Sequence, residues 1–116
     1  MQSKPQEINP LSLKNWINSE LDKPFIIDVR ESSELQIARF PYTDLHIPIS
    51  QVTIDFVKDK LRNLERKKFV ILCHRGIRSN YFGHWLLENK FVSEVWNLTE
   101  GIDAWSRFVD PNIPRY

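Results

Sequence analysis

The sequence contains little of several features that would assign it to a class at once. Its 116 residues include one cysteine, so no internal disulfide can form, which suits a reducing compartment. Sixteen Lys and Arg residues offset fifteen Asp and Glu residues, and the net charge of +1 favours neither a nucleic-acid nor a membrane partner. No apolar run approaches the length of a membrane span, and the N-terminal residues lack the apolar core of a signal peptide. We therefore expect one cytoplasmic domain over residues 1–116.

Short apolar runs alternate with segments of helical spacing along the chain. Runs rich in β-branched and aromatic residues predict strands over residues 25–29, 45–47, 68–72 and 94–98. Apolar residues three and four apart predict helices over residues 10–21, 32–38, 50–64, 79–89 and 102–108. Ser32 or Ser33 is the expected cap of the second helix and Ser50 that of the third. Strands that alternate with helices predict a parallel α/β sheet.

The only cysteine, Cys73, stands at the end of a buried apolar run. Arg75, Gly76 and Arg78 follow within five residues, and a helix is predicted directly behind them. A helix N-terminus and nearby arginines favour the reactive thiolate form of a cysteine, and the first helical amides can bind an anion. A glycine can adopt the backbone angles that turn such amides inward. A buried packing cysteine is the alternative, but packing does not require two arginines and a glycine directly afterwards.

These residues resemble the active-site loop of the rhodanese sulfurtransferases. Residues 25–31, with Glu34 beyond them, are similar to the family's Asp-Val-Arg-Glu motif at a strand end. Residues 95–105 resemble its last strand, glycine turn and Ala-Trp helix, so that the resemblance covers nearly the whole chain. It implies a three-layer α/β fold with a central, mainly parallel sheet of four to five strands flanked by helices. It also implies a short first strand at residues 7–8, which the pattern alone does not indicate.

The resemblance implies a sulfurtransferase whose nucleophile is Cys73. The thiolate would take sulfane sulfur from thiosulfate or a persulfide, hold it as a persulfide and pass it to cyanide or a thiol. The residues expected to bind the donor are His74, Arg75, Gly76, Ile77 and Arg78. Among them, Arg75 is expected to contact the substrate, Arg78 to brace the loop and His74 to lie on the rim. No metal and no organic cofactor is required.

Two residues at the end of the strand predicted over residues 25–29 are expected to support this loop. Asp28 should reach the same edge of the sheet as Cys73, because carboxyl ends of parallel strands meet there. It could orient the loop or the substrate, or it could cap the next helix. For Arg30, the resemblance implies a structural salt bridge.

Two other functions remain open on this fold. Phosphatases and arsenate reductases resembling rhodaneses use a longer loop, Cys-x5-Arg, to wrap a tetrahedral oxyanion. Here Arg78 is the fifth residue after Cys73, so the loop has the shorter, sulfur-sized spacing. Rhodanese folds that lack the cysteine resemble binding modules, and such a role is the second alternative.

The sequence departs from the family pattern in two places. Residues 34–42 replace the usual Gly-His-Ile-Pro-Gly turn, which leaves the rim of the pocket next to it undefined. Glu100 replaces the first glycine of a common pair, and its charge is expected to disfavour some anionic substrates.

The C-terminal stretch, residues 103–116, resembles the tails of rhodanese domains fused to adenylating enzymes that activate sulfur-carrier proteins. A sulfur-carrier or persulfide-donor protein is therefore a candidate partner. The simpler interpretation, which we prefer, is a tail that packs Ile113 and Tyr116 onto the sheet.

Overall fold

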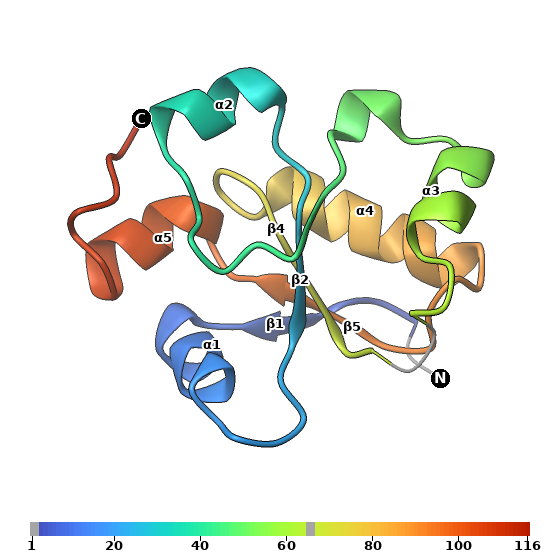
Figure 1. The fold of residues 1–116 in the computed structure, drawn as a ribbon, viewed down its shortest axis with the longest axis horizontal. Helices are drawn as coiled ribbons and strands as arrows, with labels where there is room; N and C mark the ends of the chain where they lie inside the picture. Colours follow the sequence, from blue (N-terminus) through green and yellow to red (C-terminus); the bar gives the residue numbers. More distant parts are fainter. Residues whose placement is uncertain (1–2, 65–66) are drawn as a thin grey trace.

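A single parallel sheet organises the protein. The computed structural model describes residues 3–64 and 67–116. Its five strands lie in the order β1-β5-β4-β2-β3, and every neighbouring pair is parallel (Figure 1). The strands are β1 (Gln6–Ile8), β2 (Phe25–Asp28), β3 (Leu45–His46), β4 (Phe69–Leu72) and β5 (Val95–Leu98). The predicted α/β class and the predicted sheet of four to five strands are confirmed, including the short first strand.

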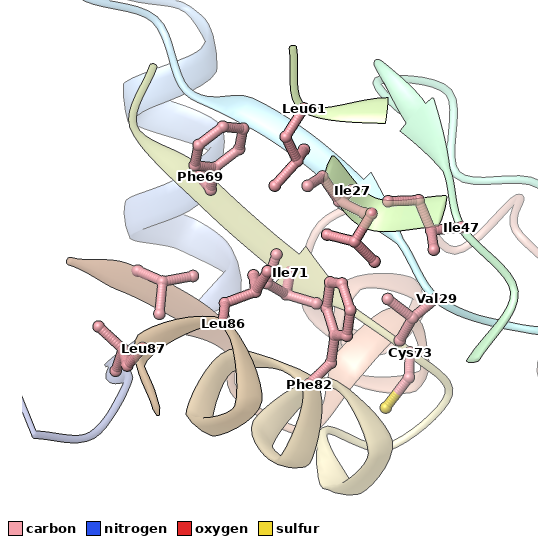
Figure 2. Packing of buried hydrophobic residues seen from close by; sticks show 12 residues of the cluster. Ile27, Val29, Ile47, Leu61, Phe69, Ile71, Cys73, Phe82, Leu86 and Leu87 are labelled. Atoms are coloured by element: carbon pink, nitrogen blue, oxygen red, sulfur yellow. The ribbon is translucent and has the colours of Figure 1, made fainter. Parts of the chain in front are cut away.

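The sheet is covered by helices on both faces, and this gives the three layers. On one face, α3 (Ile54–Lys60) and α4 (Ile77–Glu88) contribute Val57, Phe82 and Leu86 to a core cluster that also contains Ile71 and Cys73 (Figure 2). On the other face, α1 (Pro10–Ile17) and α5 (Gly101–Phe108) build a second cluster. All four residues of β4 are buried, as expected of a strand covered on both sides.

The predicted helix over residues 50–64 is wrong in its bounds. The structure has a 3-10 helix, Ile49–Gln51, and then a separate helix, α3. Thr53 caps α3, because its hydroxyl accepts a hydrogen bond from the Phe56 amide. Ser50, the expected cap, instead donates its hydroxyl to the Glu31 carboxylate at 2.5 Å.

Other helix ends also differ from the prediction. The helix α2 (Ser32–Ile37) is capped by Glu31 in a capping box with Glu34, and not by Ser32 or Ser33. The helix α1 ends at Ile17, four residues before the predicted end. The helix α4 starts two residues early, because Gly76 serves as its N-cap with φ of 90°. Over the described parts of the chain, no helix is long and apolar enough to cross a membrane.

Candidate active site

Cys73 follows β4 and directs its sulfur at the start of α4. The side chain is 1% exposed, and the sulfur points away from the apolar cluster in Figure 2. The Gly76 amide donates to Sγ at 3.1 Å and the Ser79 amide donates to it at 3.4 Å. Both donors belong to the first turn of α4, where amides have no partner within the helix. The unpaired amides and positive dipole end of the helix therefore converge on the thiol.

A chain of polar side chains continues from the sulfur through the sheet. The Ser79 hydroxyl lies 3.2 Å from Cys73 Sγ and 2.5 Å from Asn97 Oδ1. The side-chain amide of Asn97 donates through Nδ2 to the Gly76 carbonyl at 3.1 Å and to the Glu7 carboxylate at 3.0 Å. Asn97 is buried, so its hydrogen bonds fix the loop from β5 without competition from water. No local pattern indicated the role of Asn97, since its partners lie in the first turn of α4 and in β1, far from it in the sequence.

The first turn of α5 holds the other side of the loop. The Ile102 amide donates to the Cys73 carbonyl at 3.0 Å, and the Asp103 amide donates to the His74 carbonyl at 3.1 Å. This approach requires a glycine at position 101. A Cβ atom there would lie 2.4 Å from the Cys73 carbonyl oxygen, and the residue has φ of 61°. The glycine turn of the predicted motif therefore brings the α5 amides to the loop.

The two arginines of the loop have different surroundings. Arg78 makes a two-pronged ion pair with Glu34, with N–O distances of 2.7 and 2.9 Å. These hydrogen bonds are the main cause that lowers the pKa of Glu34 to about 2, and they also raise the pKa of Arg78. Arg75 is exposed on the loop. Arg78 thus braces the loop against α2, whereas Arg75 is exposed to solvent.

The pair Asp28 and Arg30 is fully buried beside the loop. The Asp28 carboxylate accepts hydrogen bonds from the Arg30 backbone amide at 3.0 Å and from the Arg30 guanidinium at 2.8 Å. The Asp28 and Arg30 side chains are 1% and 0% exposed. The capping alternative for Asp28 is wrong, because Glu31 caps α2. Although burial lowers the pKa of Arg30, the bond and charge of Asp28 raise it overall. The salt bridge implied for Arg30 is therefore made with Asp28, and the guanidinium also donates to the Ala38 carbonyl at 2.8 Å.

The tail reaches the site as well, which the sequence did not indicate. Ile113 is buried in the core cluster on the face of the sheet that α1 and α5 cover, and Tyr116 packs against that cluster, as expected of the tail. In addition, the Tyr116 ring stacks on His74 at 3.8 Å between centroids, and its hydroxyl donates to Glu34 at 2.9 Å. Since Glu34 and Tyr116 are 82 positions apart, no local pattern could have shown this contact.

A cavity of about 390 Å³ borders the loop. Arg75, Gly76, Ile77 and Asn97 line it, and so does Glu100. The Glu100 carboxylate pairs with Arg107 at 3.0 Å, which partly offsets its charge in the cavity wall. Glu100 also adopts φ of 57°, a left-handed conformation that glycine would adopt without strain.

The fold and the loop together define the class of protein. A cysteine at the end of a central parallel strand, enclosed by a short loop that opens into a helix, is an arrangement suited to covalent chemistry on an anionic group. The family model for the rhodanese-like domain matches residues 9–108. The chain belongs to the rhodanese-like domain family.

Particular relatives agree with this assignment. The chain is 41% identical over 98 residues to rhodanese-like/PpiC domain-containing protein 12, chloroplastic, of Arabidopsis thaliana, covering 83% of this chain and 31% of that protein. It is 32% identical over 111 residues to adenylyltransferase and sulfurtransferase MOCS3 of Drosophila sechellia, covering 91% and 24%. The chain thus spans about a quarter to a third of the length of these curated relatives. A crystal structure of a rhodanese-like domain protein from Staphylococcus aureus superposes with a TM-score of 0.68 at 26% identity, covering 96% and 98%.

Proposed function

We propose that this protein is a sulfurtransferase that carries sulfane sulfur on Cys73. The observation that carries the proposal is the convergence of the Gly76 and Ser79 amides on Cys73 Sγ, at distances of 3.1 and 3.4 Å. Such donors stabilise a thiolate, and they would equally stabilise the terminal sulfur of a persulfide. The MOCS3 relative is named as an adenylyltransferase and sulfurtransferase, which is consistent with this chemistry.

In the first half-reaction, the Cys73 thiolate attacks the outer sulfur of thiosulfate. A new S–S bond forms at Cys73, the original S–S bond breaks, and sulfite leaves with the electron pair. Arg75, which is exposed on the loop, pairs with the anionic donor, while Arg78 remains paired with Glu34. In the second half-reaction, cyanide or a thiolate attacks the terminal sulfur, and Cys73 leaves as a thiolate. The two steps need no external oxidant or reductant, and together they give ping-pong kinetics.

The sulfur-loaded form should be long-lived in the absence of an acceptor. An intramolecular exit for a persulfide is attack by a second cysteine, and this chain has none. The acceptor must therefore be external, either a small thiol or a partner protein. A sulfur-carrier protein is a candidate acceptor, and a persulfide-donor protein is a candidate source of the sulfur.

The test compares wild type with Cys73→Ser. After treatment with thiosulfate and removal of excess donor, intact-protein mass spectrometry should show one added sulfur atom on wild type and none on the variant. Dithiothreitol should remove the added sulfur, and thiosulfate:cyanide activity should be lost in the variant while its circular dichroism stays unchanged. Undiminished activity in Cys73→Ser would refute the assignment.

The same samples distinguish the other functions. If wild type gains no sulfur from thiosulfate or from an enzymatic persulfide donor, the binding-module alternative replaces the catalytic one. If it hydrolyses an aryl phosphate through Cys73, the argument from loop length fails. We expect no such hydrolysis, because the loop from Cys73 to Arg78 is one residue shorter than a Cys-x5-Arg phosphate loop.

A further inference from the structure

Tyr116 contacts three residues around the Cys73 loop, and no local sequence pattern indicated these contacts. Its hydroxyl donates to Glu34 Oε1 at 2.9 Å and accepts a hydrogen bond from Arg30 at 3.2 Å. Its ring lies flat against His74, with the planes 6° apart. His74 follows the nucleophile directly, and Glu34 is the partner of Arg78. One side chain therefore joins both ends of the loop to the buried Asp28–Arg30 pair.

The tail that carries Tyr116 is fixed at several points. Ile113 is buried in the core, and its carbonyl accepts a hydrogen bond from the buried Ser106 hydroxyl. Arg115 pairs with Asp103 of α5 at 2.9 Å. Figure 1 shows the tail running back from α5 and ending beside α2. The aromatic ring is thus held in place and does not rest on the surface by chance.

We propose that Tyr116 is a positioning residue for the Cys73 loop, holding its two ends so that the Gly76 and Ser79 amides stay directed at the sulfur. It acts on one end through the stack with His74 and on the other through Glu34 and Arg78. Burial is the main cause that raises the pKa of Tyr116 above its ordinary value of 10, and the protonated hydroxyl donates to Glu34 at neutral pH. The effect on catalysis rests on the sulfurtransferase function proposed above, whereas the effect on the loop does not.

The substitutions separate the ring from the hydroxyl. Tyr116→Phe keeps the stack and removes both hydroxyl hydrogen bonds, and Tyr116→Leu removes the stack as well. Tyr42→Leu is the matched control, since Tyr42 is a half-exposed tyrosine that packs edge-on against Phe40 and Trp105. It loses a comparable aromatic contact on the same side of the sheet without altering the side chains that touch His74 or Glu34.

Two measurements are made on each protein. Hydrogen–deuterium exchange of peptides that cover residues 73–79 reports on the loop, and peptides that cover residues 82–88 of α4 serve as the internal reference. The rate of sulfur loading from thiosulfate, followed by intact-protein mass spectrometry, reports on catalysis. We expect Tyr116→Leu to exchange faster in the loop alone and to load sulfur about tenfold more slowly, as small misplacements in a reacting site commonly cost. Tyr116→Phe should fall between Tyr116→Leu and wild type, and Tyr42→Leu should load within about twofold of wild type.

Each other outcome has a definite meaning. Unchanged loop exchange in Tyr116→Leu would overturn the proposal. An equal rise of exchange in the loop and in the reference peptides would also overturn it, because a general loss of stability would explain that rise. Faster loop exchange with unchanged loading would overturn the positioning role in catalysis. If wild type itself loads no sulfur, the proposed function fails, and the exchange experiment still decides whether Tyr116 holds the loop. If Tyr116→Leu does not fold, the exchange of Tyr116→Phe decides, since that variant keeps the ring.

Discussion

The buried Asp28–Arg30 pair allows a sharp test of what holds together the sheet edge that carries Cys73. Arg30 is fully buried and Asp28 is 1% exposed, so the guanidinium, which is always charged in proteins, depends on the Asp28 carboxylate to balance its charge. The substitution Asp28→Asn keeps the size of the side chain and removes the charge that balances Arg30. One nitrogen of the new amide would also face guanidinium N–H groups, which are donors too.

The expected cost follows from this geometry. Leaving a buried charge without its partner typically destabilises a protein by about 3–5 kcal/mol. A domain of this size has a total stability of roughly 5–15 kcal/mol, so the variant loses a large part of it. The thermal midpoint should fall by roughly 10–20 °C. Urea unfolding, followed by the fluorescence of the four tryptophans, gives the free energy difference directly.

Two further variants show whether the buried charge is the cause. Asp59→Asn breaks an exposed pair with Arg62, in which both side chains are 70% exposed, and should cost less than about 0.5 kcal/mol. The double variant Asp28→Asn/Arg30→Met removes the buried charge together with its partner and should be more stable than Asp28→Asn alone. The reasoning is refuted if Asp28→Asn costs less than about 1 kcal/mol, or if the double variant is the less stable of the two.

Three further predictions concern the other supports of the loop. Because the folded pKa of Glu34 lies near 2, below its usual 4.5, its ionisation stabilises the fold above about pH 5, and this contribution is lost as the pH falls toward 2. The difference in unfolding free energy between wild type and Glu34→Gln should therefore shrink over that range in urea titrations, and a constant difference would contradict it. Gly101→Ala should cost about 2 kcal/mol or more and slow sulfur loading, since its Cβ would meet the Cys73 carbonyl oxygen at 2.4 Å; equal melting temperatures would contradict this. Glu100→Gly should raise stability by up to about 1 kcal/mol in urea unfolding by removing a left-handed glutamate, and a clear loss would mean that the pair with Arg107 matters more.

Four of the five strands and the position of Cys73 at a strand end could be predicted because their signals are local. The run Phe69–Leu72 is apolar and rich in strand-forming residues, and all of it is buried in β4. The helix over residues 50–64 was predicted incorrectly for the opposite reason. Its apolar spacing fits one continuous helix, but Ser50 bonds to Glu31, which lies 19 positions earlier, and Thr53 caps the segment beyond. A tertiary hydrogen bond overrode the local pattern there.

In the site, too, features set by neighbouring residues could be predicted, and features set by distant residues could not. The different surroundings of Arg75 and Arg78 could be predicted from their positions in the loop. The contribution of Asn97 could not, because an asparagine inside a strand pattern has no feature that identifies its partners. Its role follows only from the sheet order, which sets β5 beside β4. The contact of Tyr116 with His74 depends in the same way on the path of the whole tail.

These long-range contacts bear on how an enzyme and a binding module could share one fold. The loop from Cys73 to Arg78 is held by Asn97 of β5, by the first amides of α5 and by Glu34 of α2. Each support comes from a different element, so the loop reaches its conformation only when the whole sheet and its helices have assembled. The motif in the sequence therefore does not by itself direct the amides at the sulfur. Under the proposed sulfurtransferase function, a chain that kept Cys73 but lost these supports would keep the thiol and lose the directed amides that stabilise a persulfide.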